Sequence, residues 1–246
     1  MANGIQLFIT CLGEQFYPTT LKNMVRILER LGVSMEFPEA QTCCGQPFFN
    51  NGFQVDARKV ARTWLESFSK SALPVVSPSG SCVATIRHHY QELFPAGTPE
   101  HDLVLDLQSR TFEFTEFLVH QLSVTDVGAC FPHSVTYHAS CHLLREIGMR
   151  DEPKILLKAV KNLEFIELVE EETCCGFGGS LSVLYPGVSK AMMENKVRHV
   201  IESGAEVVTV AETGCLMNIS GGLKRAGSSI RAMHLIDILA AEERDL

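Results

Sequence analysis

The sequence of 246 residues lacks the features that mark several common classes of protein. It has no run of basic residues and no mixing of basic with aromatic residues, and its formal net charge is −8, so we expect no nucleic-acid partner. Its start lacks a basic segment followed by a long apolar stretch, and its longest apolar runs are far too short to cross a bilayer. We therefore expect no transmembrane segment and a cytoplasmic location.

Signatures of the common organic cofactors are also missing. The glycine-rich stretch 176–179 matches neither a dinucleotide-binding fingerprint nor a P-loop, because no Gly-Lys-Ser/Thr follows it. No flavin, nicotinamide or haem motif is visible, and no Ser/His/Asp set stands out. Removal of a hydride from a substrate normally needs such a cofactor. Either a partner subunit or a metal centre must therefore supply any redox chemistry.

The sequence does have nine cysteines, and eight of them follow one spacing rule. Each cysteine of a first set recurs 130 to 133 residues later in a second set, and a glycine follows the adjacent pair in both. The two sets are Cys11, Cys43, Cys44 and Cys82, and then Cys141, Cys174, Cys175 and Cys215. Because cytoplasmic thiols stay reduced, these cysteines are better explained as metal ligands than as disulfides. The ninth, Cys130, has no counterpart, and we expect a small buried residue there.

The pattern of strands and helices is also duplicated. Each half opens with a strand (5–10 and 134–138), continues with a helix (19–31 and 153–160) and a second strand (34–37 and 163–168), and then has a longer helix (55–70 and 188–203) and a third strand (73–76 and 206–210). Every cysteine element follows one of these strands, where functional groups gather in parallel sheets. The segment 95–134, with a helix-like stretch at 112–121, is expected to pack on the first half.

We therefore predict an α/β protein made of two duplicated βαβ-type parallel-sheet halves, residues 1–128 and 129–246, related by pseudo-two-fold symmetry. Four thiolates in each half suit either zinc or an iron–sulfur cluster. Adjacent cysteines favour the cluster, because structural zinc sites usually use cysteines two to four residues apart. Zinc in one half, or a vicinal dithiol that acts without metal, stays open. His138 and His142 flank Cys141 and could hydrogen-bond a cluster sulfur.

At these residues the sequence resembles the cysteine-rich "CCG" domain, over almost its whole length. That domain occurs twice in one of the subunits of heterodisulfide reductase, in the iron–sulfur subunit of glycolate oxidase and in lactate utilisation protein A. The sequence looks most like the last of these families, on the stretches Pro78-Ser79-Gly80-Ser81-Cys82, Tyr137 to Arg145 and Cys174-Cys175-Gly176-Phe177-Gly178-Gly179. The resemblance implies a cytoplasmic complex, with partner iron–sulfur or redox subunits, that oxidises L-lactate to pyruvate.

One departure from the family pattern affects the expected chemistry. The fuller pattern ends in Cys-x-x-Cys, but Thr85 and Asn218 stand at the last position of the two sets. The five-cysteine version is linked to clusters that cleave disulfides, whereas four thiolates fit an ordinary [4Fe–4S] cluster. We expect an oxidoreductase component with up to two [4Fe–4S] clusters. The alternatives are a partner-binding scaffold with structural zinc and a heterodisulfide or thiol oxidoreductase.

Overall fold

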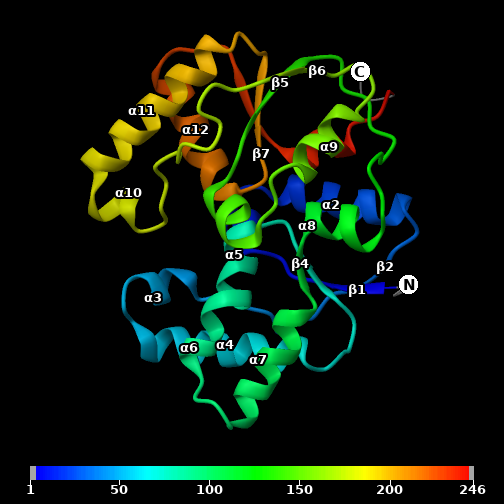
Figure 1. Ribbon diagram of the computed structural model, residues 1–246, viewed down its shortest axis with the longest axis vertical. Coiled ribbons are helices and arrows are strands. Elements are labelled where there is room, and N and C mark those ends of the chain that lie inside the picture. The colour runs from blue at the N-terminus through cyan, green and yellow to red at the C-terminus, as the bar shows by residue number, and fades with distance from the viewer. Residues whose placement is uncertain (1–3, 244–246) are drawn as a thin grey trace.

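The structure is a computed structural model that describes residues 4–243. It consists of two α/β halves that lie one above the other along the long axis (Figure 1). Each half contains a four-stranded sheet in which all neighbouring strands are parallel. The first sheet has the order β2-β1-β3-β4 and the second β6-β5-β7-β8. The strands are β1 Gly4–Leu7, β2 Ser34–Glu36, β3 Val75–Ser77, β4 Thr111–Glu113, β5 Ser134–His138, β6 Glu164–Ile166, β7 Val207–Val210 and β8 Arg231–His234.

Helices connect the strands in both halves, and three short segments, labelled η, are π-helical. In the first half the helices are α1 Cys11–Phe16, α2 Pro18–Arg30, α3 Gln46–Asn50, α4 Gln54–Phe68, α5 Gly80–Ala84, η1 Thr85–His89, α6 Tyr90–Leu93, α7 Pro99–Ser109, α8 Phe114–Glu116 and η2 Phe117–Gln121. In the second they are η3 Leu143–Ile147, α9 Glu152–Lys158, α10 Leu181–Leu184, α11 Pro186–Glu202, α12 Thr213–Arg225 and α13 Leu235–Ala240. Among the described residues, no helix is both long and apolar enough to span a bilayer.

The predicted fold class is confirmed, with one addition to each half. The three strands predicted in each half are present, and a fourth strand follows them, β4 in the first half and β8 in the second. The helix predicted over 112–121 is partly wrong, because Phe112 and Glu113 belong to β4 and the helical turns begin only at Phe114. Each fourth strand is short and is held by pairing with β3 or β7.

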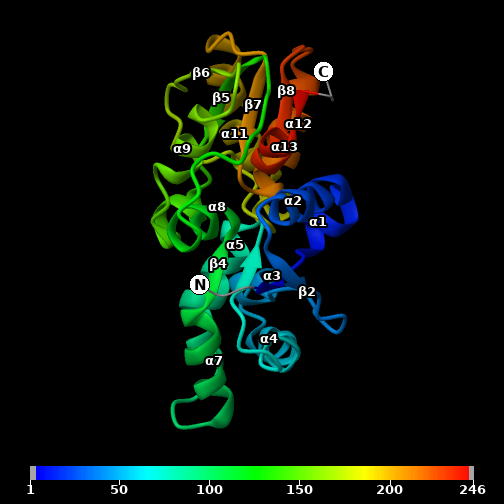
Figure 2. The same cartoon turned by 90° about the vertical axis from the view of Figure 1, so that its right-hand side faces the viewer.

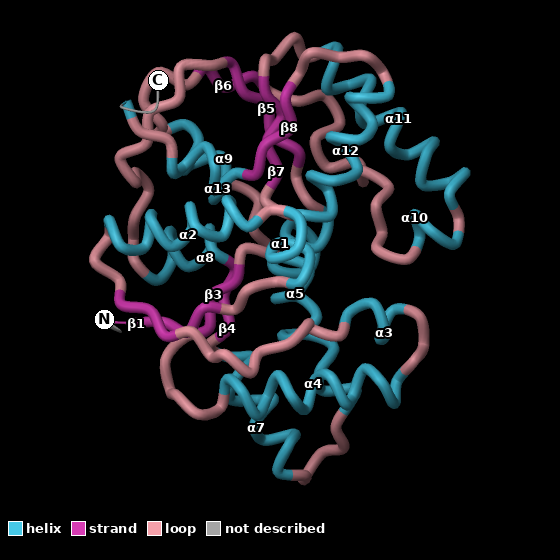
Figure 3. Tube along the Cα trace, turned by 180° about the vertical axis from the view of Figure 1, so that it is seen from behind, coloured by secondary structure: helices cyan, strands magenta, loops and turns pink. Residues whose placement is uncertain are grey.

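The two sheets share one hydrophobic core between them. Neighbouring residues of a central strand point to opposite faces. Val76 and Val207 therefore face the shared core, whereas Val75 and Val208 face cores that belong to one half alone. Helices α2, α8, α9 and α13 fill the space between the sheets (Figures 1 and 3). On the outer faces, α4 covers the first sheet, and α11 and α12 cover the second.

The contacts between the halves come in matched pairs, as pseudo-two-fold symmetry requires. Helix α2 packs on α13, and its counterpart α9 packs on α8. Near the cysteines, α5 packs on η3 and α12 packs on α1. The segment 95–134 is therefore divided, because α7 and β4 pack within the first half while α8 also contacts α9 of the second (Figure 2). The exact division at residue 128 stays a prediction.

Candidate metal centre

The four cysteines of the first set meet at the carboxyl ends of three neighbouring strands. Cys11 begins α1 after β1, Cys43 and Cys44 lie in the loop between β2 and α3, and Cys82 lies in α5 after β3. The sulfurs of Cys11 and Cys43 are 3.8 Å apart. Cys43 also contacts Cys44, which in turn contacts Cys82. Cys44 and Cys82 are buried and Cys11 is exposed, so one edge of this thiol cluster faces solvent.

The second set repeats this arrangement. Cys141 follows β5, Cys174 and Cys175 follow β6, and Cys215 lies in α12 after β7. Their side chains contact one another in the same order, from Cys141 through the adjacent pair to Cys215. Cys175 and Cys215 are buried, and the other two are partly exposed. The structure therefore brings together all four predicted residues of each set.

The thiols of each set divide into hydrogen-bond donors and acceptors. A hydrogen bond from Cys11 lowers the pKa of Cys43 to about 3, and a hydrogen bond from Cys141 lowers the pKa of Cys174 to about 2. The pKa values of Cys11 and Cys141 are raised, mainly because each thiol donates to the neighbouring thiolate and secondly because each is partly buried. The leading cysteine of each adjacent pair is thus a thiolate that accepts from its neighbours, and in the second set a hydrogen bond from Cys175 lowers the pKa of Cys215 as well. A bound cation would displace the remaining thiol protons, as metal binding to cysteines does.

The glycine after each adjacent pair shapes the loop around the sulfur. Gly45 and Gly176 have φ angles of +79° and +84°, a left-handed conformation that favours glycine. Their N–H groups donate to the sulfurs of Cys43 and Cys174, both at 3.4 Å. At Gly176 a Cβ atom would also lie 2.6 Å from the carbonyl oxygen of Ser189. These turns aim backbone dipoles at the first thiolate of each pair.

The two positions that lack a fifth cysteine support backbone groups instead. In the second half Asn218 donates from Nδ2 to the carbonyl oxygen of Cys175 at 2.7 Å. In the first half the equivalent hydrogen bond comes from Tyr90, whose hydroxyl donates to the carbonyl oxygen of Cys44 at 2.9 Å. Thr85 donates only to a carbonyl one turn earlier in its own helix, at 2.9 Å. Both halves therefore fix the buried cysteine of the pair without a fifth thiol.

His138 lies closer to the second set than its place in the sequence indicates. It is fully buried, and one of its ring nitrogens lies within 4.8 Å of the sulfurs of Cys175 and Cys215. Nδ1 is 3.2 Å from the carbonyl oxygen of Glu171, which can only accept, so Nδ1 carries the proton. Nε2 is the ring nitrogen that is left for the thiols, and the side chain contacts Cys215, an arrangement typical of a histidine beside a metal site.

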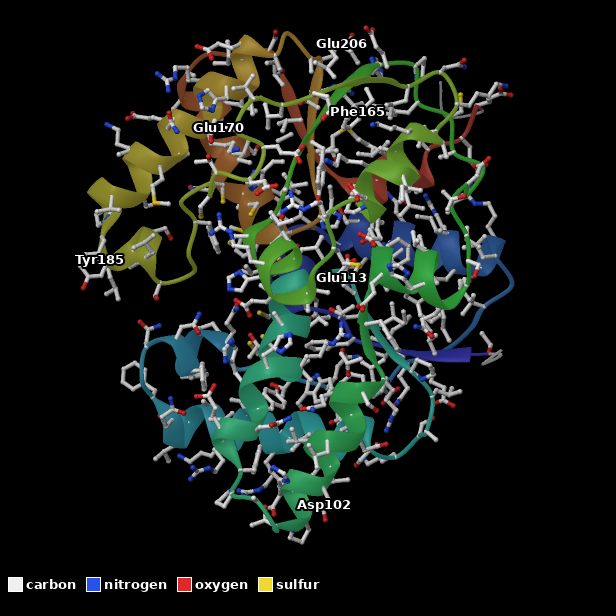
Figure 4. All side chains as sticks on the ribbon, viewed as in Figure 1. Asp102, Glu113, Phe165, Glu170, Tyr185 and Glu206 are labelled. Atoms are coloured by element: carbon white, nitrogen blue, oxygen red, sulfur yellow. The ribbon has the colours of Figure 1, made fainter. Side chains whose placement is uncertain are left out.

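Lys196, a fully buried lysine of α11, lies behind the second set and is not among the residues predicted from the sequence. Its ammonium donates to the carbonyl oxygens of Glu170 and Glu171, on the loop beside α11 that leads to the adjacent cysteines (Figure 4). Burial lowers the pKa of Lys196 to about 8, although attraction to Cys175 and Cys215 opposes this shift. A comparison of the two halves could have found it, since an aromatic residue occupies the equivalent position of α4.

A hydrogen-bonded bridge connects the two cysteine sets. Gln46, just after the first adjacent pair, donates from Nε2 to the carbonyl oxygen of Ser81 and to Nε2 of His142, both at 3.4 Å. Nε2 of His142 also lies 3.6 Å from a carboxylate oxygen of Glu146, and its Nδ1 lies 3.5 Å from the sulfur of Cys141. Each end of the bridge is thus next to a cysteine of a different half.

A partly buried carboxyl group adds a second connection between the halves. Glu212, just before α12, accepts hydrogen bonds from the Ser79 hydroxyl at 3.0 Å and the Ser81 N–H at 2.9 Å. Burial raises the pKa of Glu212 to about 7. Nearby, Gly80 approaches Leu143 so closely that a Cβ atom on Gly80 would lie 2.8 Å from that of Leu143. The loops of the two sets are therefore packed directly against each other.

These residues fit a metal held by thiolates. All nine cysteines are free, and the 3.8 Å between the sulfurs of Cys11 and Cys43 is far too long for a disulfide. Three buried polar atoms beside the cysteines make no regular hydrogen bond among the described residues, Thr10 Oγ1, Ser140 Oγ and His138 Nε2, and the side chains of the last two contact Cys215. Such atoms are rare in native proteins and often mark an ion or water. Soft thiolate donors select zinc or an iron–sulfur cluster.

The ninth cysteine and the main surface hollows lie elsewhere. Cys130 is buried, as expected, and its sulfur lies 3.5 Å from Asn162 Nδ2, before β5 begins. One surface hollow is lined by Glu206 and Arg231, and another by Cys130 and Lys161. Both lie at the amino ends of the second sheet; Glu206 marks this edge in Figure 4. The cysteines occupy the carboxyl ends, where parallel sheets bind their ligands.

Comparison with known proteins gives matches over nearly the whole chain. The family profile described as "Cysteine-rich domain" (CCG) matches residues 5–87 and 135–220. A protein named "Lactate utilization protein A" from Halalkalibacterium halodurans is 45% identical over 98% of both chains. Relatives of the same name from Shouchella clausii and Oceanobacillus iheyensis are 44% and 42% identical, over 98% and 96% of this chain and 100% and 96% of theirs.

One solved structure shares the fold at low sequence identity. It is a hypothetical protein from Helicobacter pylori, with a TM-score of 0.63 and 13% identity. The match covers 97% of this chain, which spans about half (48%) of that chain. At this identity the likeness concerns the fold alone. The family assignment therefore rests on the sequence matches.

Proposed function

We propose that this chain, which belongs to the cysteine-rich CCG-domain family of lactate utilization protein A, is an iron–sulfur redox subunit. It carries electrons in the oxidation of L-lactate, or a similar 2-hydroxy acid, to the 2-oxo acid. We assign one [4Fe–4S] cluster to each half, residues 1–128 and 129–246. The chain works with other iron–sulfur or redox subunits of one complex, in the cytoplasm, where its free thiols stay reduced.

The observation that supports this proposal most is the pair of equivalent four-thiol sets. In both halves the four ligands that we assign lie at the carboxyl ends of three strands, and the first cysteine of the adjacent pair is a thiolate. They are Cys11, Cys43, Cys44 and Cys82 for the first cluster, and Cys141, Cys174, Cys175 and Cys215 for the second. Relatives that are 42–45% identical and named for lactate utilization support the substrate class.

Oxidation of a 2-hydroxy acid to a 2-oxo acid releases two electrons and two protons. A [4Fe–4S] cluster, when bound, supplies one-electron storage. The chain itself holds the thiolates in place and balances their charge. The N–H groups of Gly45 and Gly176 donate to sulfur, and Nδ1 of His142 is positioned to do so. The exposed Cys11 leaves one edge of the first set open to a redox partner.

Metal analysis of protein purified without oxygen tests the proposal. We expect about eight iron atoms per chain, four for each cluster, with sulfide and an electron paramagnetic resonance signal after reduction. Cys82→Ala and Cys215→Ala should each lose about half of the iron. Cys130→Ser is the matched control and should lose none, because Cys130 lies outside both sets. Colourless protein that takes up no iron on reconstitution would refute the proposal.

Structural zinc in the second half is the alternative with an observation in its favour. His138, Cys175 and Cys215 offer three ligand atoms within 4.8 Å of one another, and zinc accepts such mixed sets. The same analysis separates the two cases. Zinc in the second half gives about four iron atoms and one zinc per chain, and Cys215→Ala then removes zinc and leaves the iron.

A further inference from the structure

The outer helices of the two halves bury the same positions. Helices α4 and α11 begin 132 residues apart, at Gln54 and Pro186. Five buried positions recur at that same separation, Ala57, Ala61, Trp64, Leu65 and Phe68 in α4 and Ser189, Met193, Lys196, Val197 and Val200 in α11, and only Ser67 of α4 is buried without a buried counterpart. This alignment pairs Trp64 with Lys196. The duplicated frame therefore holds an aromatic ring behind the first cysteine set and a cation behind the second.

A second exchange stands next to the first. Phe8 and His138 each precede the leading cysteine of their set by three residues, and both are fully buried. In the first half the ring of Phe8 contacts that of Trp64 edge to face, with centroids 5.6 Å apart. In the second half His138 and Lys196 meet at the carbonyl oxygen of Glu171, each at 3.2 Å. At equivalent positions, the first half thus has two aromatic residues where the second half has two basic residues.

The charge of Lys196 is not balanced by a carboxylate. Its ammonium donates to two backbone carbonyls, and no described carboxylate lies within ion-pair distance of Nζ. Burying an ion without a partner destabilises a protein strongly. Cys175 and Cys215 are the groups that attract it most strongly. The anionic thiolates, with a smaller contribution from Glu170, therefore compensate for burying this lysine.

We propose that Lys196 and His138 give the second cluster a higher reduction potential than the first, which makes the second half the electron-accepting end of the chain. Reduction adds a negative charge to a cluster, and a nearby buried cation stabilises that charge. A hydrogen bond to a cluster ligand also raises the potential of a cluster, and the side chain of His138 makes one with Cys215. Phe8 and Trp64 carry no charge, and the buried indole N–H of Trp64 is the one hydrogen-bond donor that their side chains offer. This inference rests on the proposed iron–sulfur function.

A direction of electron flow follows from this asymmetry. Electrons that reach the first cluster move to the second, where they are more stable. The contact between the sets favours this transfer, because Gln46 and His142 bridge them directly. The donor of electrons then meets the first half, and the acceptor meets the second.

A redox titration of the oxygen-free holoprotein, followed by electron paramagnetic resonance, tests the inference. Cys82→Ala and Cys215→Ala each leave one cluster, so they show which half has the higher midpoint potential. Lys196→Met removes the charge at similar size and should lower only the higher midpoint, whereas Lys196→Arg should keep it near the wild-type value. Lys190→Gln is the control, since Lys190 is an exposed lysine of the same helix, and it should change neither midpoint.

The outcomes separate the inference from the proposed function. Protein without iron refutes both. Protein with two clusters refutes the inference alone if the first half has the higher potential, or if Lys196→Met leaves both midpoints unchanged or moves them equally. Should Lys196→Met not fold, the order of the potentials in the two cysteine variants still decides the question.

Discussion

Replacing Gly80 with alanine should loosen the contact between the two cysteine loops. Gly80 opens α5, two residues before Cys82, and Leu143 lies two residues after Cys141 in the other half. A Cβ atom on Gly80 would lie 2.8 Å from Cβ and 3.1 Å from Cα of Leu143. Atoms this close to the backbone cannot move aside as the end of a long side chain can. One of the two halves must therefore shift.

The cost follows from the packing. Overpacking a tight contact destabilises a protein by about 1–3 kcal/mol. The φ angle of Gly80 is not in the left-handed region, so the penalty is steric and not conformational. With a urea m-value of about 1–3 kcal/mol per molar, the unfolding midpoint should fall by on the order of 1 M.

Urea unfolding followed by circular dichroism, with reductant and without oxygen, measures this change. Gly187→Ala is the matched control, because a Cβ atom there meets nothing within 4 Å and Gly187 also stands at a helix start with ordinary φ. That variant should be neutral or slightly more stable. If Gly80→Ala unfolds at the same urea concentration as Gly187→Ala, then the two halves are not held together at this contact.

Three further predictions concern pH, the adjacent pair and the metal. Burial raises the pKa of Glu113 from 4.5 to about 8. The stability that protonated Glu113 contributes is therefore complete below pH 4.5 and is lost as the pH rises through 8. Glu113→Gln should flatten the fall of the urea unfolding midpoint over that pH range. An equally steep fall in the variant would contradict this reasoning. Asn218→Ala leaves the Cys175 carbonyl without its donor and should cost about 1–3 kcal/mol and reduce the iron content, whereas Thr85→Ala should retain its iron. Removal of the metal with a chelator should lower the urea midpoint, since each site connects three loops, and equal midpoints for loaded and metal-free protein would argue against that role.

Much of the fold could be predicted from the sequence, because the patterns that indicate its helices and strands are local. The spacing of apolar residues in α2, which buries Leu21, Met24, Ile27 and Leu28, is a property of one helix. The short β-branched runs that form β5 and β7 are likewise local. The repeated cysteines then placed both candidate sites at the ends of predicted strands. Local patterns of this kind do not depend on what packs against them.

The fourth strand of each sheet escaped prediction for a physical reason. β4 and β8 have only three and four residues, and both include charged side chains such as Glu113 and Arg231. They form because β3 and β7 offer an open edge to pair with. An edge strand of this length takes its conformation from its neighbour, so its own sequence carries a weak signal.

The sequence by itself determined that this protein has two α/β halves and two equal sets of four cysteines. Only the tertiary structure showed which residues surround each set, and that these surroundings differ in charge. Lys196 and His138 are 58 residues apart, and nothing local indicates that they meet at the Glu171 carbonyl. Their counterparts, Trp64 and Phe8, meet as apolar rings. Pairing of this kind depends on how strands and helices distant in the chain pack together, and the cost or benefit of a buried charge arises only after packing has excluded water.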